Sequence, residues 1–158
     1  MQVERYERYW MWAATGMLLL FTGAIVATAV AGSVHPPSHI ETVDPDTLDV
    51  SGEFASPGVA IAPDGHVTVV MRAELYTFRP TVVRIPAGRP VTFRITSADV
   101  IHGFLVVGTN VNLTVAPGYV SEITTRFDTP GEYLVACNEY CGLAHHLMQG
   151  SIVAEAPH

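Results

Sequence analysis

Thiol, imidazole and thioether side chains gather near the C-terminal end of the chain, in residues 137–148. They follow one another as C-x3-C-x3-H-x2-M, through Cys137, Cys141, His145 and Met148. Steps of three and four residues place such side chains on one side of a turn or helix, where they can converge on a metal. Sulfur and imidazole are soft ligands, so the pattern favours copper over cations that prefer oxygen.

The spacing alone leaves three other interpretations open. A disulfide between Cys137 and Cys141 would close a very short loop and give His145 and Met148 no role. A structural zinc site would use both cysteines, His145 and another histidine, but zinc rarely recruits methionine. A mononuclear blue copper site needs one cysteine, two histidines and a weak axial methionine, so this loop holds one cysteine too many.

A second histidine ligand has to come from elsewhere in the chain. His102 follows a strand-like run and is flanked by apolar residues. Alone, a histidine there would be interpreted as a satisfied core residue, but together with the downstream loop it becomes the candidate remote ligand. Within the loop His146 competes with His145, and the x3 and x2 spacings to Cys141 and Met148 favour His145.

Residues 10–32 carry no charge and predict a membrane-spanning helix, because about 20 apolar residues cross a bilayer. Trp10 and Trp12 stand at the start of this segment, where an aromatic belt would lie. A cleaved signal peptide is the alternative, since residues 29–31 resemble a cleavage site. The apolar run is longer than the usual signal core, which favours an uncleaved anchor.

The charges beside this segment predict its orientation. Arg5 and Arg8 lie in the polar stretch 1–9, and no further Arg or Lys appears until Arg72. Basic residues gather on the cytoplasmic side of membrane helices. We therefore expect a single-pass protein of the plasma membrane, with a cytoplasmic N-terminus and the rest of the chain on the outer or periplasmic side.

Beyond the helix, the pattern predicts a connector and a β-rich domain. Residues 33–64 hold scattered prolines and acidic residues without periodicity, which predicts an extended linker along the sheet or a partner surface. In residues 65–158, valine-rich runs alternate with Gly and Pro turns, which predicts an antiparallel sandwich or barrel. The expected strands are 66–78, 82–85, 91–95, 104–107, 111–115, 119–127, 132–137 and 149–155.

The length of the chain indicates the number of its domains, and its charge argues against one class of partner. A chain of 158 residues corresponds to about one domain beside the anchor. The formal net charge is -7 and the eight basic residues are all arginine, without a basic patch. Nucleic acid is therefore not an expected partner.

Around the candidate ligands, the sequence resembles subunit II of the haem-copper cytochrome c oxidases, which carries the dinuclear copper A centre. The runs 99–104 and 137–142 are most similar to the B-type branch, in which this subunit has one membrane helix. The resemblance covers nearly the whole chain. It implies a mainly β, cupredoxin-like Greek-key barrel after one N-terminal transmembrane helix, with the metal at one end between two loops.

The resemblance also implies the ligand set of two copper ions. Two thiolates bridge the ions, each ion takes one histidine, and a weak axial thioether and a backbone carbonyl complete the set. By this resemblance, Cys137 and Cys141 supply the thiolates, and His102 and His145 supply the imidazoles. Met148 supplies the thioether, and Glu139 supplies its backbone carbonyl.

Expected roles extend to four further residues near the site and to the side chain of Glu139. Leu143 and Leu147 are expected to keep water from the metal. Tyr76 and Phe78 stand where electrons enter in many relatives, and they are either that entry point or a core pair. The Glu139 side chain helps to hold magnesium in most relatives, and the sequence leaves that ion open.

The function implied by the resemblance is electron transfer from cytochrome c to haem in oxidase subunit I, where oxygen is reduced to water and protons are pumped. The haems belong to that partner. Membrane lipid and a small single-helix subunit are further candidate partners. Two alternatives remain open from the sequence, namely the copper A subunit of a nitric oxide reductase and a free-standing, membrane-tethered copper carrier.

Overall fold

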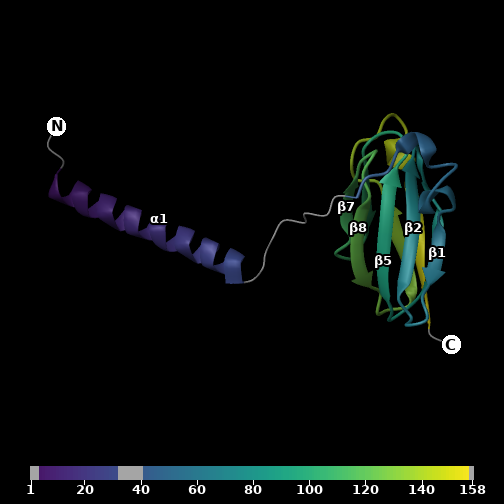
Figure 1. Ribbon diagram of the computed structural model, residues 1–158, viewed down its shortest axis with the longest axis horizontal. Helices are drawn as coiled ribbons and strands as arrows, with labels where there is room; N and C mark the ends of the chain where they lie inside the picture. Colours follow the sequence, from purple (N-terminus) through teal and green to yellow (C-terminus); the bar gives the residue numbers. More distant parts are fainter. Residues whose placement is uncertain (1–3, 32–40, 157–158) are drawn as a thin grey trace. The chain divides into compact units, whose positions relative to one another are not determined.

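The computed structural model describes residues 4–31 and 41–156, which belong to two compact units (Figure 1). The first unit contains helix α1, Arg5–Ala31. Its length and composition suit a membrane span, and a signal sequence near an N-terminus would meet the same criteria. The helix begins at Arg5 rather than at Trp10, because Glu7 and Arg8 are good helix formers and add a polar turn before the apolar run.

The second unit is a β-sandwich, and its strands are β1 Gly58–Ile61, β2 Val67–Glu74, β3 Thr77–Arg79, β4 Val82–Pro86, β5 Pro90–Ser97, β6 His102–Val106, β7 Asn112–Val115, β8 Ser121–Arg126, β9 Gly131–Ala136 and β10 Gln149–Glu155. One sheet has the order β1-β2-β5-β8, with β3 paired to β2. The other has the order β4-β10-β9-β6-β7. Figure 1 shows the first sheet in front, with β5 and β2 side by side. The predicted fold class, a mainly β cupredoxin-like domain after one apolar helix, is confirmed.

Two strand pairs depart from the expected antiparallel arrangement. β2 pairs with β5, and β4 with β10, in parallel. β4 and β5 follow one another in the sequence but lie in different sheets. The turn between them crosses the sandwich, since the N–H of Ala87 donates to Glu155 and the N–H of Gly88 donates to Phe127. The predicted run 66–78 is likewise two strands, divided by a turn at Leu75 and Tyr76.

Inward-facing side chains of both sheets form one core. Phe78, Phe93 and Phe104 are fully buried at its centre. The ring centroids of Phe78 and Phe104 are 5.5 Å apart in an edge-to-face arrangement, and those of Phe93 and Phe104 are 5.6 Å apart. Such pairs add to the free energy gained from burying the rings. They fix the two sheets, and therefore the loops at each end, relative to one another.

Residues 41–61, which lie within the predicted linker, pack against the sandwich. Leu48 and Phe54 are each 2% exposed, and burying such a side chain stabilises a fold by about 1.5–3 kcal/mol. Thr42 forms a bridge with Tyr119, and β1 pairs with β2. Two short 3-10 turns, Pro45–Thr47 and Glu53–Ala55, lie between these contacts. Pro45 begins the first of these turns, and the buried side chains of Leu48 and Phe54 anchor the segment.

Arg94 of β5 fastens this segment to the sheet. Its guanidinium donates to Glu53 at 2.6 Å and to Glu41 at 2.7 Å, and also to Glu122 of β8 at 2.5 Å. The hydrogen bond to Glu53 is the largest cause of a raised Arg94 pKa, and it outweighs the opposing effect of burial. One arginine therefore joins two points of segment 41–53 to the outer face of the sheet.

Replacing Arg94 by glutamine should loosen segment 41–53 without unfolding the sandwich. Each partly exposed ion pair contributes roughly 0.2–1 kcal/mol, so we expect the free energy of unfolding to fall by about 1 kcal/mol. Amide hydrogen exchange should speed up at Val43, whose N–H donates to Gly118, and at Val120, whose N–H donates to Glu41. Arg126→Gln is the matched control, because its partner Asp128 is a near neighbour in the sequence. Unchanged protection at Val43 in the Arg94 variant would contradict this role.

Candidate metal centre

The predicted ligands meet at one end of the sandwich. His102 is the first residue of β6. Residues 137–148, called here the ligand loop, join β9 to β10. β6 and β9 are antiparallel neighbours with Leu105 opposite Ala136, so the start of β6 lies beside the end of β9. The loop contains a short 3-10 turn, His145–Leu147, and is closed by a hydrogen bond from the N–H of Cys137 to the carbonyl of Met148.

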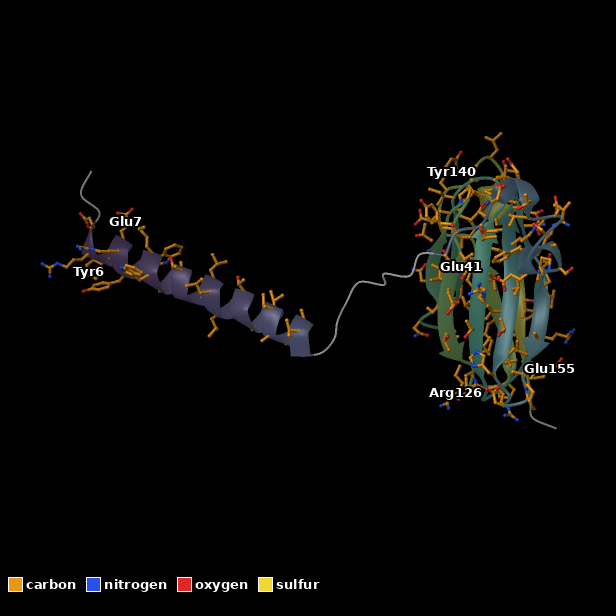
Figure 2. All side chains as sticks on the ribbon, in the orientation of Figure 1. Tyr6, Glu7, Glu41, Arg126, Tyr140 and Glu155 are labelled. Carbon is orange, nitrogen blue, oxygen red and sulfur yellow. The ribbon has the colours of Figure 1, made fainter. Side chains whose placement is uncertain are left out.

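The loop lies at the end of the domain opposite the last residue of β10, Glu155. Figure 2 shows Tyr140 at this end, opposite Arg126 and Glu155. Both cysteines are buried, and Met148 and His102 are buried completely or nearly so. His145 is partly exposed. The site is therefore shielded on the His102 side and close to solvent on the His145 side.

Cys137 occupies one half of the site. Its Sγ lies 3.9 Å from Nδ1 of His102, 3.8 Å from Sγ of Cys141 and 3.2 Å from the backbone oxygen of Glu139. His102 and both cysteines place one donor atom each within 4.8 Å of one another. Glu139 is exposed, and the contact that it makes with the cysteine is through its backbone carbonyl.

Cys141 occupies the other half. Its Sγ lies 3.5 Å from Nδ1 of His145 and 3.7 Å from Sδ of Met148. The structure thus brings all the predicted ligand residues together, with a different histidine beside each thiol. His146 is exposed and no described contact joins it to either cysteine. Two free thiols, two imidazoles, a thioether and a carbonyl in a largely buried site are a donor set that fits copper.

Asp99 is a residue of this site that the sequence did not reveal. Its Oδ1 accepts a hydrogen bond from Nε2 of His102 at 2.7 Å. Because a carboxylate oxygen can only accept, Nε2 carries the proton of this hydrogen bond, and the other ring nitrogen, Nδ1, faces Cys137. Burial works against ionisation of Asp99, but hydrogen bonds from His102, Val100 and Leu75 together lower its pKa.

The sequence carried one weak signal for Asp99, which is an acidic residue three positions before the candidate ligand His102. Acidic residues beside a histidine are common, so spacing alone could not assign a contact. Gly103 and Gly142 were missed as well. Gly103 lets β6 lie close to the ligand loop, where an added Cβ would collide with Asn138, and Gly142 lies within the loop, where an added Cβ would collide with Tyr76.

The expectation that two leucines keep water from the metal is wrong, and Phe78 has the core role that the sequence left open as an alternative. Leu143 and Leu147 are 90% and 65% exposed, so they do not keep water from the metal. The loop turns their side chains outward while its sulfur atoms face inward. Phe78 is fully buried in the core, where it contacts Phe104, so it cannot meet an electron donor at the surface. Tyr76 is partly buried beside Gly142 of the ligand loop.

Copper loading should strengthen as the pH rises. Burial, followed by the hydrogen bond with Cys137, raises the pKa of Cys141 to about 11, so this thiol is protonated at neutral pH in the metal-free protein. Binding as a thiolate must release that proton, which favours loading at higher pH. We expect the apparent affinity to increase about tenfold or more per pH unit between about pH 6 and pH 8.

This pH dependence can be measured by competition with a copper chelator at several pH values, on the full-length chain in detergent. The Cys141→Ser variant is the control, because the pH slope of any residual binding should fall by about one proton. An affinity of the unmodified chain that stays constant over this range would contradict thiolate ligation.

The sandwich and its donor set define a cupredoxin-like copper protein. A family model described as "Cytochrome C oxidase subunit II, periplasmic domain" matches residues 68–156. The "Cytochrome c oxidase subunit 2" of Thermus thermophilus is 41% identical over 155 residues, which cover 95% of this chain and 92% of that relative. The chain therefore belongs to the cytochrome c oxidase subunit II family, the electron-transfer subunit of haem-copper oxidases.

Solved structures agree with this family. A chain of a haem-copper terminal oxidase dimer is 32% identical, with a TM-score of 0.65, and the match covers 96% of this chain and 100% of that one. The periplasmic domain of subunit II from Bradyrhizobium japonicum is 18% identical, with a TM-score of 0.52 over 56% of this chain and 83% of that one, and it shares the fold. A subunit of an oxidase complex has subunit I as its partner, and one apolar helix before a periplasmic domain fits a single-pass membrane protein.

Proposed function

We propose that this chain holds a dinuclear copper A centre, receives electrons from a cytochrome c, and passes them to haem in subunit I. The observation that carries the proposal is the pairing of each thiol with its own imidazole, at 3.9 Å for Cys137 and His102 and at 3.5 Å for Cys141 and His145. A single-copper site would need only one such thiol. Bound copper would supply one-electron redox chemistry with the charge shared over two ions.

The ligand residues are held in place by the fold, which suits rapid electron transfer. His102 is fixed by β6 on one side and by Asp99 on the other. The loop is closed by Cys137 and Met148 across its base, and His145 donates from its N–H to the carbonyl of Gly142. Ligands that cannot move much keep the same geometry in both oxidation states, so little reorganisation opposes the transfer.

The ligand loop exposes several apolar side chains, and we propose that the donor docks on them. Tyr140, Leu143, Leu147 and Ile101, called here the metal-loop patch, are each more than half exposed and adjacent or near to ligands in the sequence. The Tyr140 ring lies 5.8 Å from the ring of the partly exposed ligand His145. Apolar side chains exposed together mark contact sites, and the net charge of -7 favours approach of a basic cytochrome.

Of the two residues considered as the entry point for electrons, Tyr76 is the one that lies beside the ligand loop. It is partly buried behind the ligand loop at Gly142, so it lies beneath the surface that a donor would touch. We propose that electrons enter through the exposed edge formed by Tyr140 and His145.

Replacing Leu143 and Leu147 together by serine should slow electron transfer from a reduced, basic cytochrome c by roughly tenfold. Truncating one well-placed interface side chain lowers the binding free energy by about 1 kcal/mol or more. The double variant should therefore bind the donor more weakly. Stopped-flow absorbance on the copper-loaded full-length chain gives the second-order rate constant. The absorption spectrum should stay unchanged, because neither side chain is a ligand.

The matched control for this test is Leu134→Ser. Leu134 is an exposed leucine of β9 at 46%, outside the metal-loop patch. Equal slowing by the control, or no slowing by the double variant, would remove the metal-loop patch as the docking site.

We also propose the membrane arrangement that the basic residues predicted. α1 would anchor the chain with residues 1–9 in the cytoplasm, and the copper domain would lie on the outer or periplasmic side. The exposed carboxylate of Glu139 is available to a subunit interface or a magnesium ion there. Assignment to the B-type branch rests on runs 99–104 and 137–142 and stays a prediction.

A further inference from the structure

The turn at Leu75 and Tyr76 reaches the metal end from the opposite sheet. It joins β2 to β3, which belong to the first sheet, whereas His102 and the ligand loop belong to the second. We propose that this turn is a clamp that positions both halves of the ligand set, holding His102 through Asp99 and the ligand loop through Tyr76. The proposal rests on the copper site described above, and the clamp residues position ligands without contacting metal themselves.

Asp99 connects the turn to the His102 half. Its Oδ2 accepts a hydrogen bond from the N–H of Leu75 at 2.7 Å, while its Oδ1 accepts from Nε2 of His102 at 2.7 Å and from the N–H of Val100 at 2.6 Å. Both carboxylate oxygens are therefore engaged, one by the turn and one by the ligand. The direction of the His102 ring depends on where Leu75 holds this carboxylate.

Tyr76 connects the same turn to the Cys141 half. A Cβ added to Gly142 would lie 2.7 Å from the Tyr76 hydroxyl oxygen and 3.3 Å from ring atom Cε1, so the tyrosine ring lies directly against this backbone. Gly142 follows Cys141 and has a φ of 132°, a conformation that favours glycine. Tyr76 also packs against the core, so its ring is supported from behind. The Tyr76 ring therefore limits how closely the ligand loop can approach the core.

The two contacts come from adjacent residues of one turn. A shift of that turn would therefore move the His102 imidazole and the Cys141 thiol together. Each half of the site contains one thiol and one histidine, so this shared support sets the separation between the halves. That separation governs how an electron is shared between two metal ions.

Asp99→Asn tests the first contact with almost no change of shape. An amide has one acceptor oxygen where the carboxylate has two, so either Nε2–H of His102 or the N–H of Leu75 loses its acceptor. In the metal-free full-length chain in detergent, the ¹⁵N shifts of the His102 ring should change from one tautomer, protonated at Nε2, to a mixture. In the loaded chain, copper affinity should fall by roughly 10–100-fold and the reduction potential should rise, because a negative charge beside the ligand is lost.

Tyr76→Leu tests the second contact, and Tyr76→Phe is its conservative partner. The leucine variant should change the copper hyperfine couplings and leave the His102 tautomer unchanged, while the phenylalanine variant, which keeps the ring against Gly142, should restore the couplings. If the turn acts as one clamp, the loss of affinity in Asp99→Asn combined with Tyr76→Leu should be smaller than the sum of the separate losses. Asp128→Asn and Tyr119→Leu, which change an exposed carboxylate and an exposed tyrosine, are the controls.

The outcomes separate the clamp from the proposed function. A single, unchanged His102 tautomer in Asp99→Asn, or strictly additive losses of affinity, would overturn the clamp even where the loaded wild type shows a dinuclear site. A wild-type chain that forms no dinuclear site would overturn the proposed function, and the tautomer of the metal-free protein would still report on the contact between Asp99 and His102.

Discussion

Replacing Cys141 by serine should abolish the dinuclear copper signal. Its Sγ lies close to three other donor atoms, at 3.8 Å from Cys137 Sγ, 3.5 Å from His145 Nδ1 and 3.7 Å from Met148 Sδ. A hydroxyl is a hard, protonated group that bridges copper poorly. We expect at most one copper to bind, and metal analysis with electron paramagnetic resonance of the full-length chain measures this.

Met148→Leu is the matched control for that experiment. Met148 is 2% exposed and leucine is close to it in volume, so the core should tolerate the change at less than about 1.5 kcal/mol. Both thiols remain, so two coppers should still bind, with a reduction potential altered by the loss of the weak axial ligand. Retention of the two-copper signal in Cys141→Ser would contradict bridging by this residue.

The second large effect is expected at Gly103, which follows the proposed ligand His102. A Cβ added there would collide with Oδ1 of Asn138 and would fall 2.7 Å from the N–H nitrogen of Glu139. The Asn138 side chain is also engaged, since it donates to Asn112 at 3.0 Å. The ligand loop would have to move away from β6, carrying the Glu139 carbonyl with it. Gly103→Ala should therefore lower the free energy of unfolding by about 1–3 kcal/mol and weaken copper binding.

Gly58→Ala controls for the general effect of adding a methyl group to a strand glycine. Gly58 lies in β1, and nothing stands within 4 Å of the position that an added Cβ would take. We expect unchanged stability and unchanged copper loading in this variant, by thermal unfolding and by titration with copper. A Gly103→Ala chain that loads copper as tightly as the Gly58→Ala chain would show that the loop does not depend on this close approach.

Local spacing predicted the ligand loop because its four side-chain donors lie within one turn-forming segment. The C-x3-C-x3-H-x2-M pattern needs no knowledge of distant contacts, and His102 could be added because it follows a strand and precedes apolar residues. The final strand was likewise predicted with the bounds 149–155 that the structure has. Short apolar runs between Gly and Pro turns were sufficient to predict a β-sandwich or barrel, whereas the cupredoxin-like assignment came from the family resemblance.

Features that depend on distant pairing could not be obtained in this way. A turn such as 87–89 looks like a hairpin, and only its bonds to Glu155 and Phe127 show that it crosses between sheets. Leu48 and Phe54 sit among prolines and acids, so no periodicity reveals that they are buried. The outward direction of Leu143 follows from the path of the ligand loop, because the loop must turn its donors inward. Asp99 acts through a contact with Leu75, which is distant in the sequence.

The measurement that tests the central claim most directly is electron paramagnetic resonance of the copper-loaded full-length chain in detergent, at low temperature, together with its copper content and visible spectrum. The account predicts a purple protein with two coppers per chain and a hyperfine pattern in which one unpaired electron is shared equally between them. A blue protein with one copper and the hyperfine pattern of a single ion would contradict it, as would a colourless protein that holds zinc.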